Sequence, residues 1–198
     1  MKFITIDEAY EYLKKICEEE GSLIVDERND KLYQIPFISL TFTEEIHQKV
    51  GNIYNIKIPD GVNPNMLSNY TKQLQNGNIG DFVYTYGHRF MTYFNVNQYE
   101  YMIKKLRENK HSRRAVAITI DPRKDTQENE IPCLQLIKCS IVNNKLVMSV
   151  VFRSNDISLA FKYNMFALLN VQQYISKELG IEPSEFNYVG FDVHYRII

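Results

Sequence analysis

Residues 131–164 read IPCLQLIKCSIVNNKLVMSVVFRSNDISLAFKYN, and the other elements of the chain are arranged around this stretch. Two apolar runs flank Asn143 and Asn144, a pair that tolerates positive φ and suits the two-residue turn of a β-hairpin. A regular ladder built outward from that turn pairs Cys133 with Ser154 at the open end of the hairpin. The predicted strands are Leu134–Val142 and Lys145–Phe152.

The open end of the hairpin collects the side chains of a candidate active site. Cys133 is a candidate nucleophile, and a nearby Arg153 would lower its pKa by stabilising the thiolate. In a regular ladder these two side chains would lie on opposite faces, because side chains alternate along a strand. We therefore expect a β-bulge near the end of the strands to bring Cys133 and Arg153 together.

The hairpin leads into a helix that is predicted from Asp156 to Gly180. Its apolar residues cover so much of the circumference that most of the helix must be buried. Asn164 is polar within this helix and needs partners, since an unsatisfied buried amide costs ~1–3 kcal/mol. It either holds neighbouring backbone or faces a ligand pocket, and the pattern leaves both roles open.

Length, charge and cysteine content limit the class of protein. The chain of 198 residues is long enough for one domain with a sizeable core, so we expect residues 1–198 to form a single domain. Its net charge of -1 gives no overall basic field, and nucleic acid is not an expected partner. The cysteines fit neither a disulfide framework nor a zinc site, and no apolar run is long enough to span a membrane. These features predict a cytoplasmic protein without a metal centre or a membrane partner.

The other elements follow from caps, turns and apolar spacing. Thr5 and Glu8 form a capping-box pattern at the start of a helix over residues 6–20, in which Cys17 is expected in the core rather than as a reactive thiol. Further helices are expected over residues 64–77 and from Asn95 or Asn97 to near Asn109. Further strands are expected at Ser22–Val25, Tyr33–Phe42, Ile53–Ile58, Ala115–Ile120 and Phe191–Ile198. Residues 121–130 are expected to form a polar loop. The fold class is predicted to be α+β (α/β layered), with a mixed twisted β-sheet packed against the long buried helix.

Three further segments have two interpretations each. Residues 82–94, FVYTYGHRFMTYF, predict an aromatic strand that is either core or, through polar tips such as that of Tyr86, a wall of a ligand site. Arg28 on a charged turn is either solvated or a phosphate ligand. Arg113 and Arg114 are adjacent and could clamp an oxyanion, because each guanidinium offers a planar fork of donors.

Several of these motifs together resemble the thymidylate synthase family, and most closely its shorter archaeal branch. They are YTYGxR at 84–89, SRR at 112–114, PCLQ at 132–135, RSND at 153–156, Asn164, and DxH at 192–194. The spacing also agrees with the family: Cys133 follows Arg114 by 19 positions, and Arg153 follows Cys133 by 20. The resemblance covers more than half of the chain and implies a thymidylate synthase-like fold that forms a sheet-backed homodimer.

The resemblance implies conversion of dUMP to dTMP by a methyltransferase. Cys133 would attack C6 of the pyrimidine, which makes C5 nucleophilic toward a one-carbon unit. The carrier would be a reduced pterin, either 5,10-methylenetetrahydrofolate or a methylene-tetrahydromethanopterin-type compound, which also provides a hydride. Asp156 would bond the pterin ring, and Tyr86 would lie near the water network that moves protons at the base.

The nucleotide phosphate would be held by arginines from two subunits. In the family, the residues that match Arg153 and Ser154 bind the phosphate, while those that match Arg113 and Arg114 reach it from the other subunit of the homodimer. A dianionic phosphate needs such multiple donors, which explains an arginine cluster in a chain without net positive charge. Arg28 would be a further phosphate ligand from an N-terminal loop.

The base and the sugar would be read by residues near the end of the chain. The Asn164 amide can accept from N3–H and donate to O4, which is the uracil pattern and favours dUMP over dCMP. His194 would bond the sugar hydroxyl, and Tyr195, which follows it directly where the family has one intervening residue, would be the second sugar contact.

Two other functions remain open. One is a dCMP/CMP hydroxymethylase of the same fold. The other is a catalytically silent pyrimidine-nucleotide-binding protein, for which there are two reasons. Only four residues follow His194, where longer members of the family have a tail that covers the cofactor. The segment whose glutamate orders water at the base is also not recognisable in this sequence. Glu44, Glu45 or neither would replace that glutamate.

Overall fold

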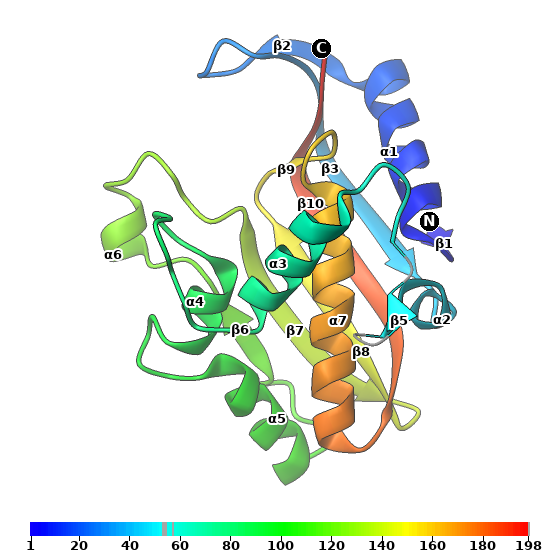
Figure 1. Cartoon of the computed structure of the whole chain (residues 1–198), viewed down its shortest axis with the longest axis vertical. Helices are drawn as coiled ribbons and strands as arrows, with labels where there is room; N and C mark the ends of the chain where they lie inside the picture. Colours follow the sequence, from blue (N-terminus) through cyan, green and yellow to red (C-terminus); the bar gives the residue numbers. More distant parts are fainter. Residues whose placement is uncertain (53–54, 57, 198) are drawn as a thin grey trace.

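The predicted hairpin forms two neighbouring strands of a mixed β-sheet in the computed structural model, which describes residues 1–52, 55–56 and 58–197 (Figure 1). Among these residues the strands are β1 (Lys2–Phe3), β2 (Ser22–Val25), β3 (Lys31–Phe42), β4 (Gly51–Asn52), β5 (Asn55–Ile56), β6 (Val116–Ile118), β7 (Leu134–Val142), β8 (Lys145–Phe152), β9 (Asn155–Asp156) and β10 (Glu182–Arg196). The helices are α1 (Ile6–Glu20), α2 (Ile46–Val50), α3 (Pro64–Leu74), α4 (Tyr86–Met91), α5 (Gln98–Glu108), α6 (Pro122–Asp125) and α7 (Phe161–Leu179). The main sheet runs in the order β1-β3-β10-β8-β7-β6, with β2 on β3 and β9 on β10, and β4 pairs separately with β5.

This architecture confirms the predicted α+β class and the mixed sheet. β10 is parallel to β8 and antiparallel to β3, so it joins the C-terminal hairpin to the N-terminal strands. α7 crosses the sheet, and α1, α3 and α5 lie on the same side of it (Figure 1). Gly180 ends α7 in the left-handed conformation (φ 69°), where a glycine has no Cβ penalty.

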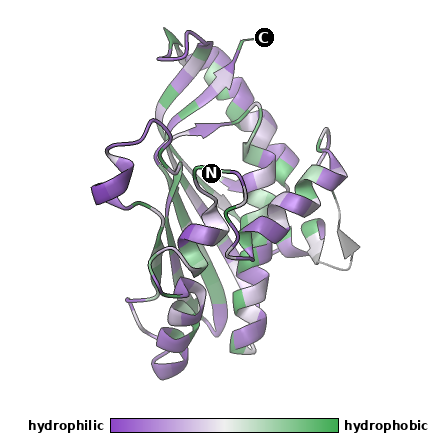
Figure 2. Ribbon diagram, turned by 60° about the vertical axis from the view of Figure 1, so that its left-hand side comes forward, coloured by the Kyte–Doolittle hydropathy of each residue, from purple (hydrophilic) through white to green (hydrophobic). Residues whose placement is uncertain are grey.

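The register places neighbouring rows of side chains on opposite faces of the sheet. One row is fully buried under the helices and consists of Ala117, Ile137, Val150, Tyr188 and Leu40. The adjacent row points the other way and is only partly covered: Ile118, Leu136, Val151, Val189 and Ser39. In Figure 2 the strands accordingly show both apolar and hydrophilic segments. Phe37 and Phe191 are 57% and 45% exposed, with ring centroids 5.7 Å apart.

The aromatic stretch was predicted to be a strand, and this was wrong because it contains the short helix α4. The Thr85 side chain accepts from His88 N–H and caps the helix. A Cβ at Gly87 would collide with the backbone oxygens of Gln73 and Asn76, so this glycine lets α4 approach α3 closely. The helix is therefore fixed by a contact with a segment outside the stretch.

Other boundaries also moved. The long helix begins at Phe161 rather than at Asp156, because Asp156 belongs to β9 and its carboxylate accepts from the N–H groups of Ser158 and Leu159. The final strand begins at Glu182, well before Phe191, since it is paired on both sides. The polar loop includes α6, and the predicted strand Ile53–Ile58 lies partly outside the described residues. No helix in the part of the chain that the structure describes is long and apolar enough to cross a membrane.

Candidate active site

The open end of the hairpin departs from the regular ladder. Leu136 pairs with Val151, as the turn predicts, but Leu134 pairs with Phe152, so one extra residue is accommodated in β7. The expected β-bulge is thereby confirmed. The predicted pairing of Cys133 with Ser154 was wrong, because the shifted register makes Arg153 N–H donate to the carbonyl of Cys133 at 2.8 Å.

A cleft of about 930 Å³ lies beside this bulge. It gathers side chains from the hairpin, from α3, α4 and α7, from the end of β10, and from the turn between β2 and β3. Eight of the residues that the sequence singled out line it: Arg28, Tyr86, Cys133, Arg153, Ser154, Asp156, Asn164 and His194. Segments far apart in sequence thus meet in one ligand-sized space.

Arg153 bonds to the backbone of the segment before Cys133 and has further N–H donors without a partner among the described residues. Its Nη2 donates to the carbonyl of Ile131 at 2.8 Å, and its Nε donates to that of Pro132 at 3.2 Å. These bonds use two of the five N–H donors of a guanidinium. The remaining three can bind an anion in the cleft while the residue continues to support Cys133.

The electrostatic environment of Cys133 contains opposing effects. Burial raises the pKa of the Cys133 thiol above its ordinary value, while the Arg153 guanidinium acts in the opposite direction. Glu130 raises the pKa further, but it forms an ion pair with Arg28 at 2.6 Å. A hydrogen bond from Tyr84 lowers it. Cys133 is therefore a partly buried thiol whose ionisation depends on the adjacent arginine.

Asp156 is fixed by both of its carboxylate oxygens. One oxygen accepts from the N–H groups of Ser158 at 2.9 Å and Leu159 at 3.2 Å, and the other accepts from Arg196 Nε at 2.5 Å. β9 pairs with β10 so that His194 lies opposite Asp156, with Nε2 of His194 3.9 Å from the carboxylate. Arg196 lines the cleft as well, and sequence reasoning missed it because its pairing with Asp156 spans 40 positions.

Asn164 lines the cleft and bonds to side chains rather than to the backbone. Its Oδ1 accepts from the hydroxyl of Tyr70 at 2.5 Å, and its Nδ2 donates to Oδ1 of Asn155 at 3.3 Å. Asn155 in turn donates through Nδ2 to the hydroxyl of Tyr188 at 3.1 Å. Sequence reasoning missed Tyr70, which resembles any partly buried tyrosine of an amphipathic helix until α3 is placed against α7.

The aromatic segment serves both as core and as a wall of the cleft. Tyr86 is buried, and its hydroxyl accepts from the N–H of Leu134 at 3.1 Å, directly after the cysteine. Tyr84 also lines the cleft, and burial raises its pKa to about 12. Arg89 does not line it: its guanidinium forms an ion pair with Asp125 at 2.5 Å, and both side chains are almost fully buried. That pair ties α4 to the loop that leads to Cys133.

Three predicted ligand residues lie outside the cleft. Arg113 and Arg114 are exposed on the connection before β6. Cys139 N–H donates to the carbonyl of Ala115, which places this segment six residues from Cys133, or roughly 20 Å along an extended strand. Tyr195 points away from the cleft toward α1, where the ammonium group of Lys14 lies 5.5 Å from the centroid of its ring.

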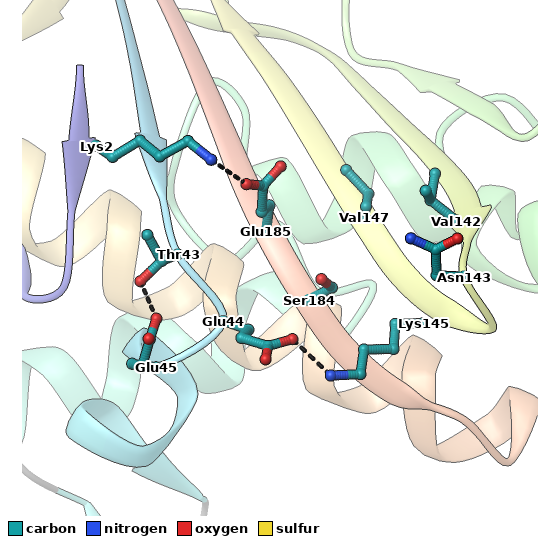
Figure 3. Close-up of a pocket in the computed structure, with 10 residues that line it drawn as sticks. All are labelled: Lys2, Thr43, Glu44, Glu45, Val142, Asn143, Lys145, Val147, Ser184 and Glu185. Carbon is teal, nitrogen blue, oxygen red and sulfur yellow. Dashed lines mark hydrogen bonds and ion pairs between the residues drawn. The ribbon is translucent and has the colours of Figure 1, made fainter.

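The two candidate glutamates line a different pocket, of about 450 Å³, at the turn end of the hairpin (Figure 3). Glu44 accepts from Lys145 Nζ at 2.6 Å, and Glu45 accepts from the Thr43 hydroxyl. Neither glutamate lines the cleft that contains Cys133. In the cleft that contains Cys133, the hydroxyl of Tyr70, and neither of these glutamates, faces the side chain of Asn164.

The charges of the cleft do not favour a bound anion by themselves. Its lining includes three arginines, which are Arg28, Arg153 and Arg196, against four carboxylates, which are Asp26, Glu27, Glu130 and Asp156. Among the described residues no group of three or more His, Cys, Asp or Glu side chains is arranged to hold a metal ion. The free arginine donors are therefore the features through which this cleft would hold a phosphate.

Known proteins are similar to this sequence over most of its length. The family model described as thymidylate synthase matches residues 40–196. A Methanosarcina mazei protein named "Putative thymidylate synthase" is 36% identical over 183 residues, covering 90% of this chain and 81% of the relative. A protein of the same name from Methanothermobacter thermautotrophicus is 30% identical over 203 residues, covering 96% of this chain and 91% of the relative. Another, from Methanocaldococcus jannaschii, is 36% identical over 169 residues, covering 78% of this chain and 76% of the relative. The predicted resemblance is confirmed, and the chain belongs to the thymidylate synthase family.

Proposed function

We propose that this protein converts dUMP to dTMP by one-carbon transfer through a covalent adduct between Cys133 and C6 of the pyrimidine. The observation that carries the proposal is that Cys133, Arg153, Asp156 and Asn164 line one cleft, although they come from different elements. The volume of about 930 Å³ is sufficient for a nucleotide and a second ring system. Family membership supports the reaction class.

Cys133 and Arg153 form the nucleophilic pair. The thiolate adds to C6 and forms an S–C6 bond, and the electron pair of the C5–C6 double bond moves to C5. C5 then bonds the one-carbon unit and loses its proton. When the one-carbon unit accepts a hydride, Sγ leaves as a thiolate and the C5–C6 double bond is restored. Arg153 favours the ionised sulfur by its charge, against the effect of burial. Tyr86 accepts from Leu134 N–H, so its own hydroxyl proton can be donated to Tyr84, to water or to the base next to Cys133.

The base edge is assigned to Asn164 and the sugar to His194. Tyr70 and Asn155 each use one hydrogen-bonding position of the Asn164 amide, so one acceptor and one donor position remain. Uracil offers N3–H and O4 to this pair. His194 Nδ1 faces the carbonyl of Asp192, and its Nε2 faces the cleft near Asp156. Tyr195 is left out of the proposed ligand set, because its ring packs beside Lys14.

The remaining part of the cleft fits a reduced pterin. When bound, this ligand supplies the methylene group and the hydride, from a folate or a methanopterin-type carrier. Asp156 has about four lone-pair positions, of which three accept from Ser158, Leu159 and Arg196, so one remains for a ring N–H. The exposed apolar side chains Met66, Phe82 and Val83 line the same cleft and offer a surface for a flat ring.

The phosphate site is completed by a second subunit. Arg153, Ser154 and Arg28 line the cleft, but carboxylates outnumber arginines there, and a dianionic phosphate needs additional positive charge. Arg113 and Arg114 are too far along the sheet to serve their own cleft. A homodimer that packs the half-covered sheet faces together, including Phe37 and Phe191, would bring these arginines to the cleft of the partner.

The reaction is tested by release of tritium from C5-labelled dUMP. Cys133→Ala should reduce release to background, while Cys139→Ala, the matched loss of a thiol from β7, which begins directly after Cys133, should retain it. Parallel assays with dUMP and dCMP, each with folate and methanopterin carriers, identify the substrate and the carrier. Tritium release by folded Cys133→Ala would contradict the proposal. Binding of dUMP by the wild type without release under any carrier would favour the silent nucleotide-binding protein.

The shared phosphate site is tested by mixing two variants. Cys133→Ala and the double variant Arg113→Ala/Arg114→Ala should each be nearly inactive. After subunit exchange at equal amounts, about a quarter of wild-type activity should return, since half of the dimers are mixed and each has one complete site. No recovery, with exchange verified by mass spectrometry, would show that the arginines do not act across an interface.

A further inference from the structure

We infer that Tyr70 and Asn155 are specificity-determining positioning residues, which hold the Asn164 carboxamide through a buried row of hydrogen bonds that ends at Tyr188. The row runs from Tyr70 to Asn164, from Asn164 to Asn155, and from Asn155 to Tyr188. The inference rests on the proposed function, because Asn164 is the residue assigned there to the base edge. The inference also names the side chains that determine how the Asn164 amide is oriented toward the base.

Four separate elements build this row. Tyr70 comes from α3, Asn164 from α7, Asn155 from β9 and Tyr188 from β10. Asn155, Asn164 and Tyr188 are almost completely buried, while Tyr70, Asn164 and Asn155 also line the cleft and Tyr188 does not. The row therefore begins at the ligand site and ends in the core. Buried polar groups are retained when they are hydrogen-bonded to each other, since an unpaired one is costly.

The row of hydrogen bonds determines which donor and which acceptor the Asn164 amide presents to the cleft. A carboxamide has two acceptor positions on oxygen and two N–H donors on nitrogen. Tyr70 uses one acceptor position and Asn155 uses one donor, so Asn164 presents one acceptor and one donor to the cleft. Uracil matches that pair with N3–H and O4, whereas cytosine has an acceptor at N3 and a donor at the 4-amino group and needs the amide turned over.

Turning the amide of Asn164 over by itself would break the row. Its nitrogen would face Tyr70, and its oxygen would face the carbonyl oxygen of Asn155, leaving two acceptors opposed. Reversal of all three bonds requires Asn155 to turn as well and both hydroxyls to exchange their roles. Burial raises the pKa of Tyr70, so its hydroxyl keeps the proton that it donates. The row thus makes reorientation of Asn164 a concerted event rather than a free rotation.

The test uses three tyrosine-to-phenylalanine variants, each of which removes one oxygen atom. Tyr70→Phe deletes the bond to Asn164, and Tyr188→Phe deletes the far end of the row while keeping its ring packed between Phe152 and Phe161. Tyr163→Phe is the matched control: its ring packs edge-on against Tyr70, but its hydroxyl accepts from Asn63 N–H. The measurements are kcat and KM for dUMP and dCMP, and calorimetric binding of both nucleotides.

For Tyr70→Phe we expect about a tenfold rise in KM for dUMP, about a tenfold loss of preference for dUMP over dCMP, and a kcat within a few-fold of the wild type. Tyr188→Phe should shift the preference in the same direction by roughly threefold, and Tyr163→Phe should leave it unchanged. A structural role alone would lower thermal stability without changing the preference.

The outcomes separate this inference from the proposed function. A wild type that turns over dUMP, with Tyr70→Phe retaining the full preference for dUMP, would overturn the inference alone. A wild type that binds dUMP without turnover would overturn the proposed reaction, and the same three variants would then decide the inference by their ratios of dUMP to dCMP binding constants. Equal ratios for Tyr70→Phe and Tyr163→Phe would again reject it.

Discussion

The two ends of the β7–β8 hairpin differ in what determines their geometry. At the turn end, Asn143 and Asn144 adopt positive φ values of 50° and 60°, and the register is regular from there to Leu136. At the open end the register shifts, and this shift makes Arg153 the partner of Cys133. The turn follows from the local preference of two residues, whereas the shifted end serves the site.

Cys133 and Cys139, near the open end and in the regular part of the hairpin, differ in the environment of their thiols. Cys139 is fully buried among apolar residues, and burial raises the pKa of its thiol to about 12. Cys133 is partly exposed to a cleft, and Arg153 opposes the effect of burial there. We therefore expect identical side chains six residues apart to differ in reactivity because of what surrounds them.

The largest expected effect comes from removing the charge beside Cys133. Arg153→Met should lower kcat/KM for dUMP by about 10²–10³-fold, because both the proposed contact with the phosphate and the stabilisation of the thiolate would be lost. The thiolate is the active form, so activity rises with pH through the pKa of Cys133. Since Arg153 lowers that pKa, its loss should move the rise in kcat to higher pH.

The control is Arg123→Met, which removes an exposed arginine that pairs with Asp121 outside the cleft. Its pH profile should coincide with that of the wild type. An Arg153→Met profile that also coincides with the wild type would show that Arg153 does not set the ionisation of Cys133.

A smaller effect is expected in the alkylation of the two thiols. Iodoacetamide at pH 8 should modify Cys133 roughly 100-fold faster than Cys139, because only Cys133 lies in an accessible cleft beside a cation. Peptide mass spectrometry gives the two rates. Bound dUMP should protect Cys133, and unfolding in urea should make the two rates similar. Equal rates in the folded protein would contradict the contrast between the two ends.

The smallest effect is expected at the turn. Asn144→Gly should stabilise the fold by about 0.5 kcal/mol, because glycine adopts this positive φ without a Cβ penalty and Asn-Gly is a preferred two-residue turn. Asn144→Val should destabilise it by about 1–2 kcal/mol. Thermal unfolding measures both. Turnover of dUMP should be unchanged in Asn144→Gly, and a changed turnover would show that the two ends of the hairpin are coupled.

The parts of the site that sequence predicted are those carried by short motifs. Cys133, Arg153, Asp156 and Asn164 were found by residue type and by motif spacings that resemble those of the thymidylate synthase family, and the structure brings all four to one cleft. Tyr70, Asn155 and Arg196 were not found, because each acquires its position from an element distant in sequence. Tyr70 is 94 positions from Asn164, and no local pattern distinguishes it from a core tyrosine.

By itself, the sequence determined the elements that local interactions specify. These are the capping box of Thr5 and Glu8, the turn at Asn143 and Asn144, and the end of α7 at Gly180, where each signal lies within a few residues of the structure it specifies. The tertiary structure alone decided that residues 86–91 form a helix against α3, that β10 is paired on both sides, and how the hairpin register shifts. It also placed Tyr70 against Asn164 and moved Glu44 and Glu45 to another pocket. The physical reason is that strand pairing and helix packing join segments tens of residues apart, whereas propensities, caps and turns act over only a few.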